Sequence, residues 1–209
     1  MLREAFPEYG ILAEEGGAMP GGGEYRWIVD PIDGTVNFAH GLPAFCVSIA
    51  LERAGEIVLG VVHDPMGEEI FVAERGGGAT LNGRPIRVSE TGELIRALVA
   101  TGFPYDRDTM PAALELFGRF AVLTQGMRRI GSAALDLCYV AAGRMDAYYE
   151  HGVKAWDIAA GVLILEEAGG KTTDFRGDGL DLEGLEIVAT NTALHPSIVD
   201  VTRDERAGT

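Results

Sequence analysis

Basic side chains are scarce in this sequence. Its 209 residues include 17 Lys and Arg against 32 Asp and Glu, which gives a formal net charge of −15. Because a nucleic-acid partner requires a basic face, this balance argues against nucleic acid as a partner. An anionic ligand such as a phosphate ester is also repelled, unless a bound cation reverses the field where the ligand binds.

Long apolar runs and targeting signals are lacking too. No stretch approaches the roughly 18 consecutive apolar residues of a membrane span, so no membrane partner is expected. The first residues, MLREAFPEYG, have neither the basic region nor the apolar core of a secretory signal. The two cysteines, Cys46 and Cys138, lie far apart in apolar runs, and no C-x-x-C occurs. These features predict buried, reduced thiols and a cytoplasmic protein.

Several catalytic motifs are absent as well. The sequence has no G-x-x-x-x-G-K-[ST] loop, which excludes a P-loop nucleotide-binding enzyme. It has no H-E-x-x-H, and its 4 histidines show no metal-ligand spacing. Neither cysteine lies in a loop that could cradle a phosphate, which argues against a cysteine phosphatase.

Alternating apolar residues and turn signals predict that the first half consists mostly of strands. The glycine-rich residues 16–23 are expected to form a loop between the first two strands. The expected strands cover residues 10–14, 25–30, 45–53, 56–64, 69–75 and 84–88.

The second half alternates strands with helices, which indicates an α/β layer. Ser132 is expected to cap a helix that Gly143 closes. We therefore expect a mostly antiparallel β half, residues 1–92, and an α/β half, residues 93–209, in one compact unit. The expected strands are 97–101, 146–150 and 186–191, and the expected helices are 109–123, 132–143, 157–168 and a C-terminal one.

The segment from Trp27 to Phe38, WIVDPIDGTVNF, carries the clearest chemical signal. An apolar strand leads into Asp30, where proline is expected to stop strand pairing. Asp33 follows three residues later, so a single helical turn is expected to place both carboxylates on one side. Gly34 permits a tight bend, and Thr35 stands where a short helix begins. Such a turn offers oxygen ligands for a divalent cation and free N–H groups for a phosphate oxygen.

Two further acidic sites fit the same chemistry. Glu14 and Glu15 end the first strand, and Asp157 starts the buried helix DIAAGVLILEEA. Taken singly, Asp157 is also explained as a helix N-cap, and the glutamate pair as solvated surface. Together, acidic groups at three strand or helix ends favour a two-metal phosphate site. The spacing of Asp30 and Asp33 excludes a phosphatase with an aspartyl nucleophile, which needs a D-x-D pair.

These residues resemble the inositol monophosphatase family. The resemblance rests on Glu14-Glu15, on DPIDGTVNF at 30–38, on RRIGSAA at 128–134, on DAYYE at 146–150 and on WDIAAG at 156–161. It implies an α+β fold of αβαβα layers and a Mg²⁺-dependent, Li⁺-sensitive phosphomonoesterase in which metal-activated water attacks phosphorus. It also implies two or three Mg²⁺ ions and a homodimer.

The resemblance assigns a role to each motif residue. Glu14, Asp30 and the carbonyl of Ile32 are expected to hold one metal ion, and Asp30, Asp33 and Asp157 a second. Thr35 is expected to orient or deprotonate the attacking water, with Glu15 beside the site as a supporting catalytic residue. The substrate is expected to contact the N–H groups of Gly34 and Thr35, the side chain of Arg129 and the carboxylate of Glu150.

The resemblance leaves the substrate open. Inositol 1-phosphate is the first expectation, with fructose 1,6-bisphosphate and histidinol phosphate as alternatives. Members of the family have two helices before the Glu-Glu motif, whereas Glu14 comes almost at once here. We therefore expect the first sheet to expose apolar surface. A shortened, weakly active homologue that acts as a binding or assembly protein is the alternative function.

Overall fold

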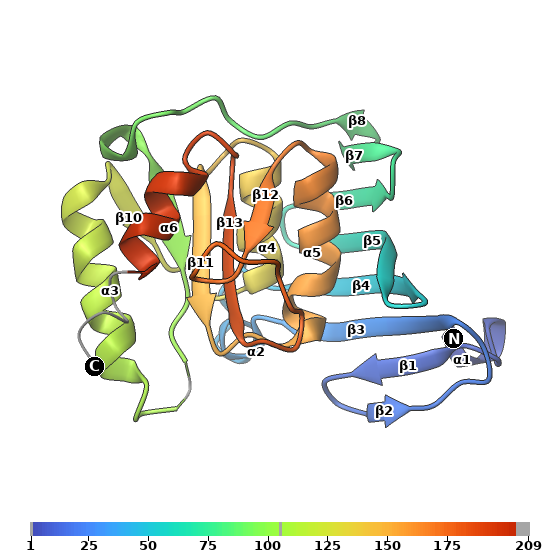
Figure 1. The fold of residues 1–209 in the computed structure, drawn as a ribbon. Coiled ribbons are helices and arrows are strands. Elements are labelled where there is room, and N and C mark those ends of the chain that lie inside the picture. The colour runs from blue at the N-terminus through green and yellow to red at the C-terminus, as the bar shows by residue number, and fades with distance from the viewer. Residues whose placement is uncertain (1, 105, 204–209) are drawn as a thin grey trace.

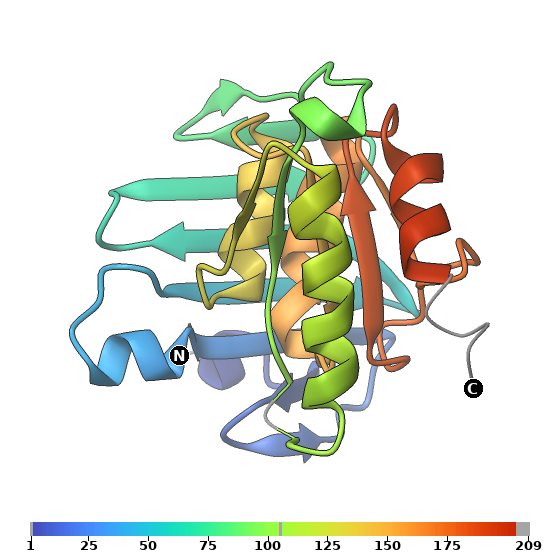
Figure 2. The same cartoon turned by 90° about the vertical axis from the view of Figure 1, so that its left-hand side faces the viewer.

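Two β-sheets and two helical layers alternate in this protein. The computed structural model describes residues 2–104 and 106–203. In Figure 1 the eight-stranded sheet lies to the right, followed leftwards by α4 (Ala133–Ala141) and α5 (Ala155–Glu167), the five-stranded sheet, and α3 (Met110–Leu123) with α6 (His195–Arg203). Figure 2, turned by 90°, shows α3 in front of the small sheet. The expected layered α+β fold is confirmed, as a β-α-β-α stack within the described residues.

The large sheet has the strand order β2-β1-β3-β4-β5-β6-β7-β8. All neighbouring strands are antiparallel except β1 and β3. The strand β2 lies in the segment that was expected to be a loop, and the strand expected over 84–88 is only two residues long. The strands are β1 (Gly10–Ala13), β2 (Gly17–Met19), β3 (Tyr25–Asp33), β4 (Cys46–Arg53), β5 (Glu56–Asp64), β6 (Glu69–Glu74), β7 (Gly78–Leu81) and β8 (Arg84–Pro85).

The small sheet has the order β10-β9-β11-β13-β12. Its first three strands are parallel, and β13 runs antiparallel to both of its neighbours. The two edge strands, β10 and β12, were not predicted. The strands are β9 (Leu98–Thr101), β10 (Gly126–Arg128), β11 (Ala147–His151), β12 (Lys171–Thr173) and β13 (Glu186–Thr190). Three short helices complete the described chain: α1 (Leu2–Ala5), α2 (Thr35–Ala39) and the 3₁₀ helix η1 (Leu94–Arg96).

Helix α5 is apolar on nearly all sides because it is enclosed between the two sheets. It crosses β3 to β7 on one side and packs beside α4. A Cβ atom at Gly60 would lie 2.7 Å from the carbonyl oxygen of Ala160, and one at Gly161 would lie 2.7 Å from Leu137. These two glycines therefore let α5 approach both β5 and α4 closely. In the part of the chain that is described, no helix is long and apolar enough to cross a membrane.

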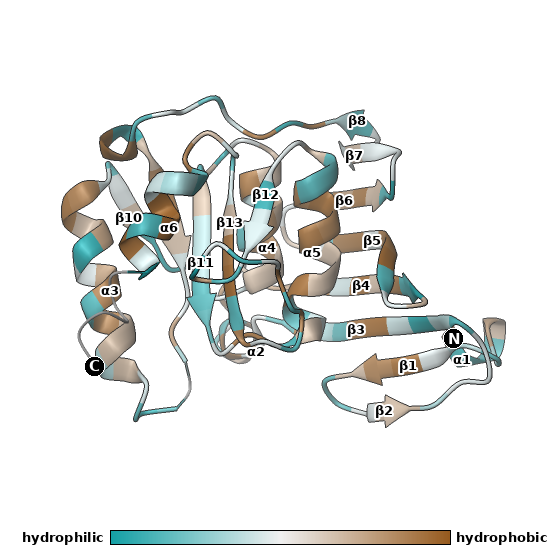
Figure 3. Cartoon of the chain, in the orientation of Figure 1, coloured by the Kyte–Doolittle hydropathy of each residue, from teal (hydrophilic) through white to brown (hydrophobic). Residues whose placement is uncertain are grey.

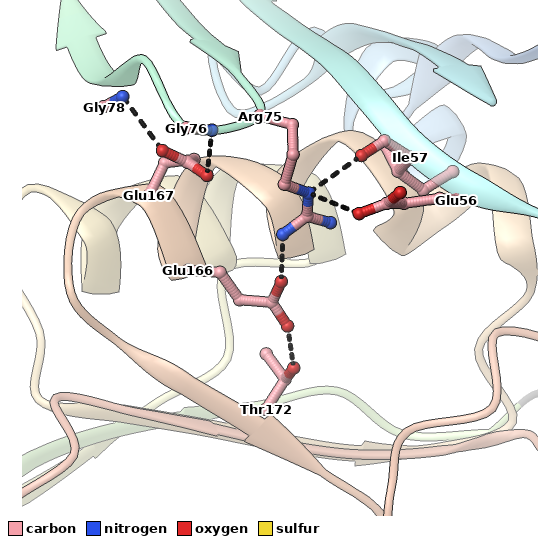
Figure 4. A network of polar contacts seen from close by, with 8 residues as sticks. All are labelled: Glu56, Ile57, Arg75, Gly76, Gly78, Glu166, Glu167 and Thr172. Atoms are coloured by element: carbon pink, nitrogen blue, oxygen red, sulfur yellow. Dashed lines mark hydrogen bonds and ion pairs between the residues drawn. The ribbon is translucent and has the colours of Figure 1, made fainter. Parts of the chain in front are cut away.

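The C-terminal end of α5 is fastened to the large sheet by a polar network (Figure 4). Arg75 donates to Glu166 at 3.0 Å and to the carbonyl of Ile57 at 3.2 Å. The carboxylate of Glu167 accepts the N–H groups of Gly76 at 2.8 Å and Gly78 at 2.9 Å. Thus the end of the helix opposite to Asp157 is held by the β6–β7 turn.

The other face of the large sheet is apolar and partly exposed. Cross-strand pairing aligns Val29, Ile49, Val61 and Val72 in one row, and all four are only partly buried. Figure 3 shows apolar stretches on β3, β5 and β6. No helix among the described residues covers this row, as α4 and α5 lie on the opposite face. The expected exposure of apolar surface on the first sheet is therefore observed.

Candidate active site

The predicted site residues converge on one cavity of about 290 Å³. It lies where α4 and α5 begin and where β3, β9 and β11 end. Nine of the ten predicted residues line it: Glu14, Asp30, Ile32, Asp33, Gly34, Thr35, Arg129, Glu150 and Asp157. The tenth, Glu15, is exposed in the β1–β2 turn and is not among the described residues that line the cavity.

A β-bulge, rather than the expected helical turn, brings Asp30 and Asp33 together. Strand β3 continues to Asp33, and its register against β4 shifts between the two aspartates: Asp30 pairs with Ser48, and Asp33 with Cys46. In a regular strand, residues three apart point to opposite faces. The one extra residue of the bulge turns both carboxylates to the same buried side, where Asp30 is 2% and Asp33 is 8% exposed. The prediction of a helical turn was wrong, although the two side chains do share a face.

Asp33 is bound to the N-terminus of α4. Its Oδ2 accepts the hydroxyl of Ser132 at 2.6 Å and the N–H of Ala134 at 2.8 Å. Burial raises the pKa of Asp33 to about 6, while these two hydrogen bonds act in the opposite direction. The positive end of the helix dipole favours the ionised carboxylate in the same way.

The carboxyl groups of Glu14, Asp30 and Asp157 lie close together at the cavity. The Oδ1 of Asp30 accepts the N–H of Ile32 at 2.9 Å. The pKa of Asp30 is raised to about 7, chiefly by burial, with smaller contributions from the neighbouring carboxylates of Glu14 and Asp157. The pKa of Asp157 is also raised to about 7, chiefly by burial. Ionised carboxylates this close together repel one another, and a bound cation would relieve that repulsion.

The alternative interpretation of Asp157 as the N-cap of α5 is wrong. The helix begins at Ala155 with Lys154 as the N-cap, so Asp157 occupies the third helical position. From there its Oδ2 accepts the N–H of Lys154 at 2.7 Å. This contact satisfies a free amide at the helix start and directs the carboxylate to the cavity.

Gly34 and Thr35 form the expected bend and helix start. Gly34 has φ 91° and is the N-cap of α2, and a Cβ there would lie 2.8 Å from the carbonyl oxygen of Ala44. The hydroxyl of Thr35 donates to the carbonyl of Ile32 at 2.9 Å. Asn37, further along α2, donates to the carbonyl of Ile130 at 2.9 Å and so ties this helix to the segment that carries Arg129.

Glu150 and Arg129 lie on the side of the cavity that the small sheet forms. The hydroxyl of Tyr148 donates to Oε2 of Glu150 at 2.7 Å. The pKa of Glu150 is raised to about 7, chiefly by burial, although that hydrogen bond and the charge of Arg129 act in the opposite direction. A half-buried acceptor and an exposed cation thus face the aspartates across the cavity.

Sequence reasoning did not identify Ser132 or Gly102 as lining residues of the cavity, nor Asp136, which is buried nearby. Ser132 was predicted only as a helix cap, which it is, because its Oγ accepts the N–H of Leu135 at 3.3 Å, but it also donates to Asp33. Gly102 lines the cavity beside Glu150. Asp136 is fully buried, and neither of its side-chain oxygens has a hydrogen-bond partner among the described residues. Burial raises its pKa well above 3.8, and the charges of Glu150 and Asp33 add to that effect.

The donor set matches a hard divalent cation. Glu14, Asp30, Asp33 and Asp157 offer carboxylate oxygens and Ile32 a carbonyl, which are the ligands that Mg²⁺ prefers. As their side chains lie, no three acidic, histidine or cysteine residues among those described surround a single point closely. The thiols nearby are buried and free, as expected for Cys46 and Cys138.

Comparison with known proteins identifies the family of this chain. A model of the inositol monophosphatase family matches residues 1–207. The chain belongs to the inositol monophosphatase family. The membership supports a phosphatase enzyme and confirms the resemblance that the motifs indicated.

Three family members illustrate the likeness. The Nus factor SuhB of Pseudomonas aeruginosa is 49% identical over 197 residues, 91% of this chain and 73% of that protein. The inositol-1-monophosphatase of Rhizobium meliloti is 48% identical over 202 residues, 96% of this chain and 76% of that protein. The inositol monophosphatase structure from Anabaena (Nostoc) sp. has a TM-score of 0.92 and 47% identity, and the match covers 97% of this chain and 81% of that one.

Proposed function

We propose that this protein is a Mg²⁺-dependent phosphomonoesterase that hydrolyses inositol 1-phosphate or a related sugar or polyol phosphate. The observation that carries the proposal is the single cavity in which four carboxylates from three separate motifs face Arg129 and Glu150. Family membership and the inositol-1-monophosphatase name of relatives support the same chemistry.

The acidic side of the cavity is proposed to hold Mg²⁺. Glu14, Asp30 and the Ile32 carbonyl hold one ion in this proposal, and Asp30, Asp33 and Asp157 a second. When bound, Mg²⁺ supplies an activated water and neutralises the charge of the leaving alkoxide. The ions also answer the electrostatic difficulty that a protein of net charge −15 poses for an anionic substrate.

The rest of the chain positions the two reactants. The hydroxyl of Thr35 lies 2.9 Å from the carbonyl oxygen of Ile32, a proposed metal ligand. This hydroxyl is proposed to orient the attacking water. The N–H groups of Gly34 and Thr35 are proposed to donate to a phosphate oxygen. On the opposite side, the carboxylate of Glu150 accepts a hydroxyl of the substrate alcohol, and Arg129 lies beside that alcohol.

Phosphate release tests the proposal directly. The protein is incubated with inositol 1-phosphate, fructose 1,6-bisphosphate and histidinol phosphate, each with Mg²⁺ and with EDTA. We expect Mg²⁺-dependent release that is fastest with inositol 1-phosphate. A faster reaction with fructose 1,6-bisphosphate points to an Arg129 contact with its second phosphate. No release with any substrate, on protein shown to be folded, contradicts the proposal.

A second candidate function is non-catalytic. Several relatives are named Nus factor SuhB, among them the one 49% identical. A binding or assembly role of that kind does not need the carboxylates of the cavity. Asp33→Asn separates the two functions, since it is expected to abolish hydrolysis and to leave a binding role that uses the protein surface intact.

A further inference from the structure

The backbone of Gly102 packs directly against the carboxyl group of Glu150. It follows β9 directly, and Thr101 pairs with Tyr149 across the parallel strands, so Gly102 lies beside Glu150. A Cβ atom on Gly102 would overlap Cδ, Oε1 and Oε2 of Glu150, well inside contact distance. The backbone of Gly102 does not have a positive φ, so conformation alone does not require glycine here. The space that Glu150 occupies is what excludes a side chain.

The same carboxyl group is held from β11 itself. The hydroxyl of Tyr148, whose side chain is fully buried, donates to Oε2 of Glu150 at 2.7 Å. Glu150 is thus enclosed between this donor and the surface of Gly102. Its direction into the cavity is therefore fixed by two strands and does not depend on the substrate.

From this contact we infer that Gly102 is a specificity-determining residue, which positions Glu150 to select phosphate esters whose alcohol carries a further free hydroxyl. The inference rests on the proposed phosphatase function. A carboxylate only accepts hydrogen bonds, so its correctly placed oxygen favours a substrate with a hydroxyl donor. An aryl phosphate offers no such donor and gains nothing from Glu150.

Alanine at position 102 is expected to move Glu150 without unfolding the protein. The atoms that the new methyl group meets are the far end of a flexible side chain, so Glu150 can rotate away. That rotation breaks the Tyr148 hydrogen bond and withdraws the acceptor from the cavity. The loss of one hydrogen bond to a charged group predicts a rise in KM for inositol 1-phosphate of about tenfold or more. The loss with p-nitrophenyl phosphate is expected to be much smaller.

A double-mutant cycle tests the coupling of the two residues. KM and kcat are measured with both substrates for wild type, G102A, E150A and the double variant. We expect G102A to raise the KM for inositol 1-phosphate in the wild-type background and to have no further effect beside E150A. Additive effects of the two substitutions, or equal losses with both substrates, overturn the inference. The matched control is G92A, because a Cβ on Gly92 meets nothing within 4 Å and leaves the kinetics unchanged.

A crystal structure of G102A separates this inference from the proposed function. If wild type hydrolyses neither substrate, the phosphatase proposal fails, and the position of Glu150 still decides the structural claim. A carboxyl group turned away from the cavity, with its Tyr148 contact broken, supports the positioning role of Gly102. A Glu150 that remains in place, with the backbone shifted instead, overturns it.

Discussion

Asp33→Asn separates the chemical role of the central aspartate from its structural role. The Oδ2 of Asp33 accepts the hydroxyl of Ser132 at 2.6 Å and the N–H of Ala134 at 2.8 Å. Asparagine has the same shape and keeps one carbonyl oxygen for these donors. The substitution therefore removes the negative charge and the second acceptor oxygen, with little change in packing.

The two consequences for stability have opposite signs. Loss of the charge weakens the interaction with the start of α4, which is worth about 0.3–2 kcal/mol at a helix N-terminus. Against this, burial raises the pKa of Asp33 to about 6, with a smaller contribution from the charge of Asp30, so a neutral amide relieves the cost of a buried charge. The free energy of unfolding is thus expected to change by less than about 2 kcal/mol.

Activity is expected to respond much more strongly. A neutral amide is a poor ligand for a hard divalent cation, and metal-ion catalysis contributes several kcal/mol to the transition state. A loss of about 4 kcal/mol corresponds to a rate reduction of about 1,000-fold. Turnover of inositol 1-phosphate with Mg²⁺ is the assay, beside a denaturant titration of metal-free protein. Near-wild-type turnover in a folded Asp33→Asn variant refutes the assignment of this residue to the metal site.

Ser132→Ala is the matched control for that experiment. It removes one hydrogen bond to Asp33 and the side-chain cap of α4 but keeps the carboxylate charge. We expect it to lower stability by about 1 kcal/mol and to retain Mg²⁺-dependent turnover. A loss of turnover as large as that of Asp33→Asn would mean that geometry, rather than charge, is the sensitive property of Asp33.

Three further predictions follow from the site and the sheets. Ca²⁺ in place of Mg²⁺ is expected to inhibit phosphate release, because Ca²⁺ prefers longer bonds and more ligands, and full activity with Ca²⁺ counts against the two-metal proposal. The family resemblance also predicts inhibition by Li⁺. Burial raises the pKa of Asp136 well above 3.8, so the folded protein keeps a proton that the unfolded chain releases. Asp136 therefore lowers the free energy of unfolding by about 1.4 kcal/mol per pH unit between its unfolded and its folded pKa. Asp136→Asn is expected to reduce the slope measured in denaturant titrations from pH 5 upward with EDTA present by that contribution, while the raised pKa values of Asp30, Asp33, Asp157 and Glu150 keep the remainder. An unchanged slope disproves the buried neutral acid. The partly exposed apolar row that contains Val61 predicts self-association, so light scattering is expected to give a mass above that of one chain. Val61→Lys is expected to reduce this mass, and a monodisperse wild-type monomer contradicts the prediction.

Local patterns were sufficient to predict the long elements of the fold. Strands β4, β5 and β6 follow from alternating apolar residues between turns, and α5 follows from an apolar run too long for a strand. The short edge strands β2, β10 and β12 could not be found in this way. Each has three residues, which is too few for any period to show, and each exists only because a longer neighbour pairs with it.

The candidate site, like the fold, depends partly on local sequence patterns and partly on contacts between residues far apart in the sequence. The motif around Asp30 and Asp33 indicated a shared face, but the bulge that creates it depends on pairing with β4. The contact between Ser132 and Asp33 joins residues 99 positions apart, so no local pattern could indicate it. Gly102 gave no signal either, because a glycine after a strand is usually explained by a turn. Only the position of β11 beside Gly102 shows that the absence of a side chain at Gly102 makes room for Glu150.

The thickness of the inner helical layer determines the width of the proposed active site. Asp30 and Asp33 project from the large sheet, whereas Glu150 projects from the small one. The two sheets are held apart by α4 and α5, and close packing of this layer depends on Gly60 and Gly161. A larger side chain at either position would push α5 from its neighbours and carry Asp157 with it. The distance across the cavity is thus set by packing that lies outside the cavity itself.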